Sequence, residues 1–537
     1  MASVGATTSG DIFFNSSPDN HSRLFNSLFA IVLAYSLLVA VVVYVFAGEP
    51  AIGFVMVGGT VVVALSFLRP VYSLYILVFL GFVCEQFPTI DGWTASLRYH
   101  SNLSNVSLRL TGIPITPMEI HLLLIVSGLL VRVVIHGAKK IHVIALKPML
   151  IYAAVIIAGV VYGLVKGGEF LPALWEVRAI FYLFFLALIV PRLVSNPQQI
   201  KVIIWLMVIG LSLRAVEVIH SYANTGWALG GLDAFGNPID GFGNHEDAGF
   251  WATILAFTVG LSILKISSKL RTFLFVFAVP FFVAVIASGR RTFYAVIGNC
   301  IIVIFLLLDK SIQKRILQTG WKIGLVFVFY LAIFWNSNSD FAGPAHSIKM
   351  SFGEDMEEAG GRYLSNMYRK VEDHNLATSY RSQTLVGSGY GTKLTFYMPL
   401  PLSWDMGFYS PHNQILGVFV KTGFVGFVFF LFFYLTTISE ISGAFGDEKD
   451  VYRKAVLTFA IATIMNHLVY SFFDIMLTGY RNNLQVGVML GLASSIITMQ
   501  QQSIPPVVKD TPSPVSNPIH RLLGAGKKEE RSRPVYS

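Results

Sequence analysis

The sequence PHNQILGVFVKTGFVGFVFFLFFYL, residues 411–435, is long and apolar enough to cross a membrane. About 18 or more mainly apolar residues can span a bilayer core of about 30 Å as one helix, because a helix satisfies its own main-chain hydrogen bonds. Proline cannot lie inside a helix but suits its first turn, so Pro411 predicts the helix start. His412 and Asn413 would then lie at the mouth of a transmembrane helix.

The whole chain has the composition of a membrane protein. Of its 537 residues, 54% are hydrophobic and 13% are charged, and its mean hydropathy is +0.64. Soluble chains carry about 25% charged residues. We therefore predict an all-α, polytopic membrane protein with about 14 transmembrane helices. The predicted spans are residues 24–46, 51–67, 71–87, 118–135, 148–165, 177–194, 202–219, 248–264, 273–288, 292–308, 323–335, 412–435, 455–472 and 484–499.

Basic residues predict which helix ends face the cytoplasm, because Lys and Arg gather in the short loops on the inner side of a membrane. With the N-terminus inside, every predicted inner loop is basic, from Arg69 in the first to Lys449, Arg453 and Lys454 in the last. The formal charge of +9 is thus an orientation signal and does not indicate a nucleic-acid surface. Both termini are predicted to be cytoplasmic.

The chain divides into tails, helices and one long outer loop. Residues 1–22 and 503–537 are polar or rich in Pro and Ser, and we predict them to be disordered cytoplasmic tails. Residues 23–335 would hold helices 1 to 11, and residues 411–502 would hold helices 12 to 14. Between them, residues 336–410 form the predicted periplasmic loop.

Arginines on the outer side break the charge rule and suggest an anion to be held. Arg290 and Arg291 occupy the tight SGRR turn, and a guanidinium inside a membrane helix costs about 2.5 to 3.5 kcal/mol. Arg178, Arg214 and Arg362 are also assigned to the outer half. A diphosphate would suit them, because guanidinium groups bind phosphate oxygens bidentately and stay charged. The alternative is that these side chains only reach lipid headgroups.

The outer loop contains one predicted amphipathic helix, GRYLSNMYRKVEDHN, residues 361–375. Arg362 and Arg369, seven apart, share one face, and the apolar residues recur at helical spacing on another. Those apolar residues are Tyr363, Leu364, Met367, Tyr368 and Val371. The helix would either act as a lid that lowers an arginine onto the anion or rest on the membrane surface. The LVGSGYGTK that follows, residues 385–393, lacks the Lys-Ser/Thr ending of a phosphate loop, so as a nucleotide signal it is weak.

His412 is the candidate base. A neutral imidazole can accept a hydroxyl proton at neutral pH, and His412 is predicted to be outside, after a loop that supplies cations. The alternative is a capping or hydrogen-bonding role at the helix start. The sequence shows no His-x-x-His or carboxylate array at metal-ligand spacing, so we predict no metal site.

Four motifs together resemble the O-antigen ligase and polymerase superfamily of bacterial envelope glycosyltransferases. They are ASGRRTFYAVI (287–297), GRYLSNMYRK, LVGSGYGT and SPHNQILGVFVKTGFVG (410–426), and the resemblance covers about residues 241–433. It implies an all-helical, GT-C-like membrane fold and a metal-independent transferase that uses undecaprenyl-diphosphate-linked sugars and no cofactor. It also implies a location in the bacterial inner membrane, with the active site on the periplasmic face.

The resemblance implies roles for individual residues. The arginine after the Ser-Gly turn falls on Arg291, with Arg290 as the shifted alternative, and the loop arginine falls on Arg362. These arginines would hold the donor diphosphate, and His412 would help to activate the acceptor hydroxyl. Further residues are assigned to the site by their predicted place on the outer face: Arg178 and Arg369 for the diphosphate, and Asn413 and Arg214 for positioning.

The stretch GFGNHEDAGFW, residues 241–251, departs from the family pattern, which is less charged here. Glu246 and Asp247 could share the base role or orient His412. The alternative is a capped helix start at Asn244 to Asp247.

The sequence leaves the acceptor open. We favour a polymerase of lipid-linked repeat units, with an inverting mechanism. The alternatives are a ligase that transfers glycan to lipid A core or protein, and a lipid-linked glycan transporter or flippase, whose charges would line a path through the membrane. The expected partners are the lipid-linked donor, the acceptor, the bilayer and other polysaccharide-assembly proteins.

Overall fold

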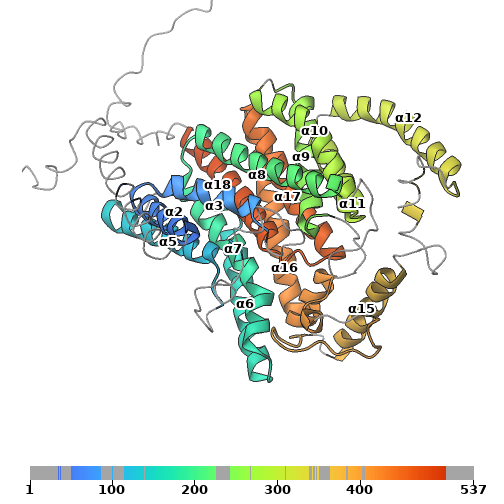
Figure 1. Cartoon of the computed structure of the whole chain (residues 1–537), viewed down its shortest axis with the longest axis horizontal. Helices are drawn as coiled ribbons and strands as arrows, with labels where there is room; N and C mark the ends of the chain where they lie inside the picture. The colour runs from blue at the N-terminus through green and yellow to red at the C-terminus, as the bar shows by residue number, and fades with distance from the viewer. Residues whose placement is uncertain are drawn as a thin grey trace, which may run out of the picture.

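The computed structural model describes residues 34, 37, 50–85, 99–100, 114–137, 140–224, 242–266, 268–308, 310–337, 342, 345, 348–349, 363–382, 385–401 and 405–503. Most of these residues form helices, packed around one another as Figure 1 shows. The longer helices are α2 (Pro50–Leu68), α3 (Pro70–Val83), α5 (Pro117–His136), α6 (Leu146–Val165), α7 (Phe170–Leu193), α8 (Pro197–Asn224), α9 (His245–Ile263), α10 (Lys269–Ser288), α11 (Thr292–Leu307), α12 (Lys310–Phe334), α15 (Tyr363–Ser382), α16 (Gln414–Asp447), α17 (Val451–Phe473) and α18 (Tyr480–Ser503).

The predicted all-α membrane fold is confirmed. Each predicted span after the first overlaps one of these helices, whereas the first, residues 24–46, lies almost wholly outside the described residues. Among the described residues, seven helices are long and apolar enough to cross a membrane: α5, α6, α7, α8, α10, α16 and α17. The chain is therefore a multi-pass membrane protein. The total of fourteen crossings remains a prediction.

One end of the bundle joins the segment before α6 to the last parts of α16 and α18. The Glu440 carboxylate lies 3.0 Å from the His142 ring and accepts the Ala145 N–H at 3.3 Å. The His142 N–H donates to Thr498 Oγ1 at 3.0 Å. The sequence predicts all three segments on the inner side, and in the structure they are in contact.

The other end of the bundle collects segments that the sequence predicts on the outer side. Gln414, the first residue of α16, donates to Thr478 Oγ1 at 2.9 Å and accepts the Leu477 N–H, so α16 begins against the turn between α17 and α18. The Phe242 N–H donates to the Ala287 carbonyl at 2.9 Å, which places the segment before α9 against the SGRR turn.

The helix α16 begins later than predicted and is interrupted. Asn413 caps it by accepting the Leu416 N–H at 3.2 Å, so the helix starts at Gln414 and not at Pro411. Gly423 has a φ of 67°, a left-handed conformation that breaks the helix there. The break occurs because a glycine at this position can adopt a backbone that other residues resist.

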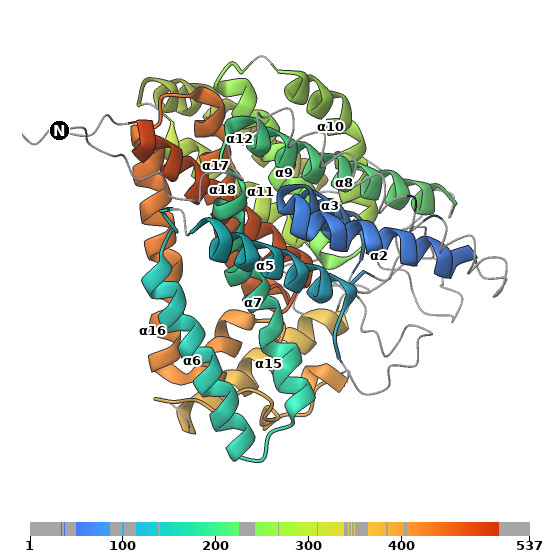
Figure 2. The same ribbon diagram turned by 90° about the vertical axis from the view of Figure 1, so that its left-hand side faces the viewer.

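The glycine-rich loop at residues 385–393 packs into this break. The Ser388 and Gly389 N–H groups donate, each at 2.9 Å, to the carbonyls of Val420 and Lys421, which lie just before the break in α16. A Cβ atom on Gly389 would lie 2.4 Å from Gly163 Cα of α6, so only glycine fits. The loop therefore supplies main-chain partners to an interrupted helix. Figure 2 shows α6 and α16 side by side.

The predicted helix in the outer loop is confirmed as α15, which lies beside the lower part of α16 in Figure 1. Its predicted apolar face is only half correct. Tyr368 and Val371 are buried, whereas Leu364 and Met367 are 48% and 40% exposed. The buried face continues through the polar residue Glu372, because its partners at the start of α16 are polar too.

Candidate active site

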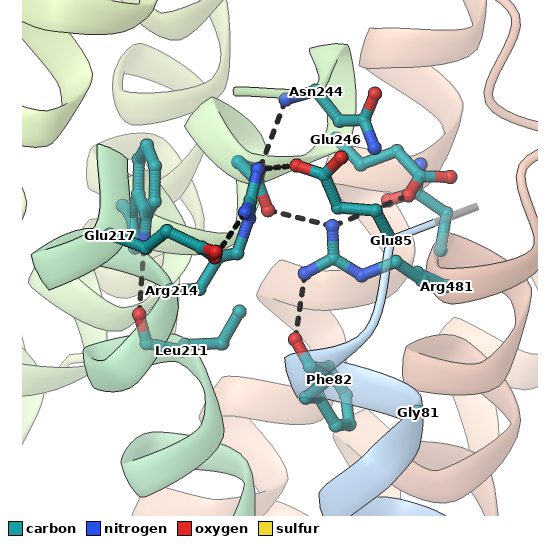
Figure 3. Close-up of polar contacts among 12 residues, drawn as sticks. Gly81, Phe82, Glu85, Leu211, Arg214, Glu217, Asn244, Glu246 and Arg481 are labelled. Atoms are coloured by element: carbon teal, nitrogen blue, oxygen red, sulfur yellow. Dashed lines mark hydrogen bonds and ion pairs between the residues drawn. The ribbon is translucent and has the colours of Figure 1, made fainter. Parts of the chain in front are cut away.

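A closed cluster of charges joins α8 to the ends of α3, α9 and α18 (Figure 3). The Arg214 guanidinium donates to Glu217 at 2.5 Å and to Asp247 at 3.2 Å, and it pairs with Glu85. The Arg481 guanidinium donates to Asp247 at 2.7 Å and to the Phe82 carbonyl at 2.8 Å. Neither arginine has any solvent-exposed side-chain surface. The charges of both arginines are therefore paired with carboxylates of the protein.

This cluster holds three residues that the sequence suggested for the active site. Arg214 is surrounded by carboxylates, and Asp247 binds both arginines and also accepts the Asn244 N–H at 3.0 Å, as an N-terminal cap does. Glu246 is buried, and its Oε2 lies 3.8 Å from Arg481 Nη1. This geometry is that of a structural network which holds α8 and three helix ends together.

Arg178 lies in a second enclosed setting on α7. Its guanidinium donates to the Pro114 carbonyl at 2.9 Å, lies 4.0 Å from Glu119, and stacks over the Tyr480 ring at 4.7 Å from the ring centre. Because these contacts tie α7 to the segment before α5 and to α18, we interpret Arg178 as a packing residue.

Arg290 and Arg291 occupy the turn between α10 and α11, at the end of the bundle that the sequence predicts to face outward. Both are only partly buried. Within the described part of the chain, the Arg290 Nε has no hydrogen-bond partner, and Arg290 lies within electrostatic range of Tyr470 at the end of α17. The turn therefore presents cationic groups that are less enclosed than Arg214. Arg362, the predicted loop arginine, lies outside the described residues.

His412 lies between α16 and α15. Its main-chain N–H donates to Glu372 Oε2 at 2.9 Å, and its ring Nδ1 lies 3.3 Å from Glu372 Oε1. The Tyr368 ring meets the imidazole edge to face at 5.1 Å between centres. The His412 side chain keeps 22% of its surface exposed, whereas that of Glu372 keeps 1%. Glu372 and Tyr368 thus hold the His412 ring, while part of its side chain stays exposed.

Asn413 makes a second contact between α15 and the start of α16. Its Nδ2 donates to Asp373 Oδ1 at 3.2 Å while its Oδ1 caps α16. Burial raises the pKa of the Asp373 carboxyl above its ordinary value, and the Asn413 hydrogen bond and the nearby Arg369 oppose that rise. Consecutive acidic residues of α15 therefore hold consecutive residues at the start of α16.

A small pocket lies beside Pro411, between α7, α16 and the turn before α18. A buried ion pair of Lys421 and Glu176, with Nζ and Oε1 3.0 Å apart, forms part of its wall. Lys421 also donates to the Thr392 carbonyl at 2.6 Å, and Glu176 accepts the Gly391 N–H at 2.6 Å. This pair ties the glycine-rich loop to the two helices.

Sequence reasoning missed Glu372, Arg481 and the Lys421–Glu176 pair. Arg481 had a usable signal, because it opens α18 on the predicted outer side, where the charge rule also singled out Arg178. Glu372 had none, because its partner lies 40 residues away across a loop. Among the described residues, no three His, Cys, Asp or Glu side chains gather as metal ligands would.

The fold and this site define a multi-pass, all-α membrane protein with a carboxylate-bound histidine at one end of its helices. Residues 273–431 match the family model described as O-antigen ligase. The matched segment includes the SGRR turn, α15 and His412, and it covers less than half of the chain. This match supports the resemblance of the segment to the O-antigen ligase and polymerase superfamily that its motifs predict. No curated protein matches the chain.

Proposed function

We propose that the protein is an inverting glycosyltransferase that transfers an undecaprenyl-diphosphate-linked glycan to an acceptor hydroxyl. The observation that carries this proposal is the setting of His412. It lies within the family-matched segment, at the predicted outer end of α16, with its side chain held by Glu372 and 22% exposed. A histidine placed in this way suits proton transfer from a substrate hydroxyl.

The proposed reaction has one bond made and one broken at the anomeric carbon. His412 takes the acceptor proton, the acceptor oxygen attacks the carbon, and the carbon–oxygen bond to the diphosphate breaks on the opposite face. The bonding electrons leave with undecaprenyl diphosphate. Fixed guanidinium groups stabilise the negative charge that develops on its oxygens, without reorganisation at the moment of reaction.

The arginines that suit this role are those that the fold leaves least enclosed. Arg290 and Arg291 lie at the same end of the bundle as His412, and Arg369 lies on α15, one turn before Asp373. Arg362 remains in the proposal from the motif alone. Arg178 and Arg214 leave it, because each is occupied by protein groups. Asn413 acts through its cap and its bond to Asp373.

A transporter remains the competitor from another class. Its charged groups would line a path near the membrane midplane. Here Glu85 follows α3, and Asp247 and Arg481 lie in the first turns of α9 and α18, so three of the four contributing segments lie at helix ends. Arg214 and Glu217 lie inside α8. This placement favours the enzyme.

Reconstitution is the direct test. Purified protein in lipid nanodiscs, given lipid-linked glycan and acceptor, should release undecaprenyl diphosphate in step with glycan transfer. Movement of the lipid-linked glycan across the bilayer with its diphosphate bond intact would support a flippase instead.

The acceptor is decided by a cellular test. We favour the polymerase, so deletion of the gene should leave single repeat units on a surface-glycan gel. Loss of every unit from lipid A core would instead support the ligase. Reporter fusions at Lys314 and Lys449 should be cytoplasmic, which tests the proposed periplasmic face of His412; an external Lys449 would reverse it.

A further inference from the structure

Both carboxylate oxygens of Glu372 lie against one residue, His412. It lies on the face of α15 that packs against α16, and its side chain is 1% exposed. One oxygen accepts the His412 main-chain N–H at 2.9 Å, and the other lies 3.3 Å from the His412 Nδ1. Both oxygens therefore contact the same residue.

This contact decides which ring nitrogen of His412 carries the hydrogen. A carboxylate can only accept hydrogen bonds, so Nδ1 must be the donor in the neutral ring. The lone pair then lies on Nε2, the nitrogen on the far side of the ring from Glu372. The Tyr368 ring, edge to face with the imidazole, restricts its rotation.

The rest of α15 holds Glu372 in place. Asn375 Oδ1 accepts the N–H groups of Tyr397 and Met398 at 2.9 and 2.8 Å, and Ser379 donates to the Thr395 carbonyl at 3.0 Å. Together with the bond between Asp373 and Asn413, these contacts fix α15 both to α16 and to the segment after the glycine-rich loop. The geometry is that of a rigid support and not of a hinged lid.

We propose that Glu372 is a positioning residue: it orients the His412 ring through Nδ1, leaves Nε2 to take the acceptor proton, and stabilises the imidazolium that forms. This inference rests on the proposed function. The acceptor O–H bond breaks as the Nε2–H bond forms, the acceptor oxygen bonds to the anomeric carbon, and the diphosphate leaves with the electron pair. His412 then returns the Nε2 proton to water.

A buried carboxylate suits this role because a positive neighbour offsets part of its desolvation cost. An anion taken out of water is destabilising unless it is paired or well hydrogen-bonded. The charged groups on α15 nearest to the pair are Asp373, which repels Glu372, and Arg369, which interacts with Asp373. Protonation of His412 during the reaction would give Glu372 a charged partner, so the site is organised for the transition state.

The kinetic test replaces Glu372 by Gln, which keeps the shape but offers one acceptor oxygen where His412 has two donors. We expect kcat to fall about 10²- to 10⁴-fold in Glu372→Gln, as when a triad carboxylate is replaced by an amide, while KM for the lipid-linked glycan changes by less than about 3-fold. The matched control is Glu440→Gln at the other end of the bundle, where the carboxylate likewise contacts a histidine ring, that of His142, and accepts a main-chain N–H; this variant should keep kcat within about 3-fold. Equal kcat values for Glu372→Gln and wild-type protein would overturn the proposal.

A second measurement does not depend on activity. In protein labelled with ¹⁵N-histidine, the His412 signals can be assigned by their absence in His412→Gln, and they should report a neutral ring with hydrogen on Nδ1. Hydrogen on Nε2 would overturn the role of Glu372 whether or not the protein transfers glycan. A wild-type protein with the Nδ1–H ring but no transfer would instead count against the proposed function.

Discussion

Two polar regions at the end of the bundle that the sequence predicts to face outward use similar residues in opposite ways. The Arg214–Arg481 cluster contains two guanidinium groups among carboxylates from three segments of the chain, and both arginines are fully buried. The His412–Glu372 contact has one buried carboxylate and an imidazole that remains partly exposed. The first region is closed to any substrate, whereas the second has one side open.

The difference shows what separates a structural charge from a functional one in a membrane protein. Both kinds of charge are costly to insert into a membrane, because any arginine or carboxylate within the membrane region needs a partner. The exposure of the side chain tells them apart. Arg214 is fully buried among carboxylates, whereas the His412 side chain, with Nδ1 beside Glu372, keeps 22% of its surface exposed.

The largest effect should follow from opening the closed cluster. Arg481→Ala removes one of the two cations of a buried network, so that Arg214 alone faces Asp247 and the other carboxylates, and we expect a loss of about 3 to 5 kcal/mol of stability. We expect the variant to accumulate poorly in membranes, with a lower thermal midpoint in detergent. Arg481→Ala with a wild-type midpoint would show that the cluster does not hold these helix ends.

The arginines of the SGRR turn should behave in the opposite way. Arg291→Ala should fold normally but lose about 10²- to 10³-fold in glycan transfer, since a fixed donor to the leaving diphosphate is gone. Arg291→Lys should recover little, because lysine lacks the bidentate fork. Arg290→Ala is the paired variant, and the larger loss of the two identifies the arginine that faces the diphosphate. Full activity in both would assign the turn to lipid headgroups.

The smallest effect should come from the exposed face of α15. Met367 is 40% exposed and lies one residue before Tyr368, which packs on His412. Met367→Gln should change the free energy of unfolding by less than about 0.5 kcal/mol and leave transfer unchanged. A clear loss of activity or of membrane recovery would show that this face rests on lipid, as the alternative interpretation of the helix holds.

The sequence predicted the helices well because each is specified locally. Apolar length sets a span and helical spacing sets α15, whereas the partners of a polar side chain depend on folding. The Ser-Gly turn and the His-Asn helix start were visible as motifs. The enclosure of Arg214 could not be predicted, because its partners Glu85, Glu217 and Asp247 come from three separate segments. The charge rule found costly residues and could not say whether they were satisfied.

The position of the α16 start shows the same limit on a smaller scale. Pro411 was a sound signal for a nearby helix start, but Asn413 caps the first turn more effectively, because its side chain accepts a main-chain N–H. His412 therefore precedes the helix, in a segment free to bond Glu372 by both its main chain and its ring.

The central claim is that His412 takes the acceptor proton, and single-turnover transfer by His412→Gln tests it most directly. Glutamine keeps a hydrogen bond to Glu372 but cannot accept a proton at neutral pH. We predict that transfer falls about 10²- to 10⁴-fold, while the thermal midpoint and the affinity for lipid-linked donor stay at wild-type values. Transfer at the wild-type rate would contradict the account, because the ring would then only position the acceptor.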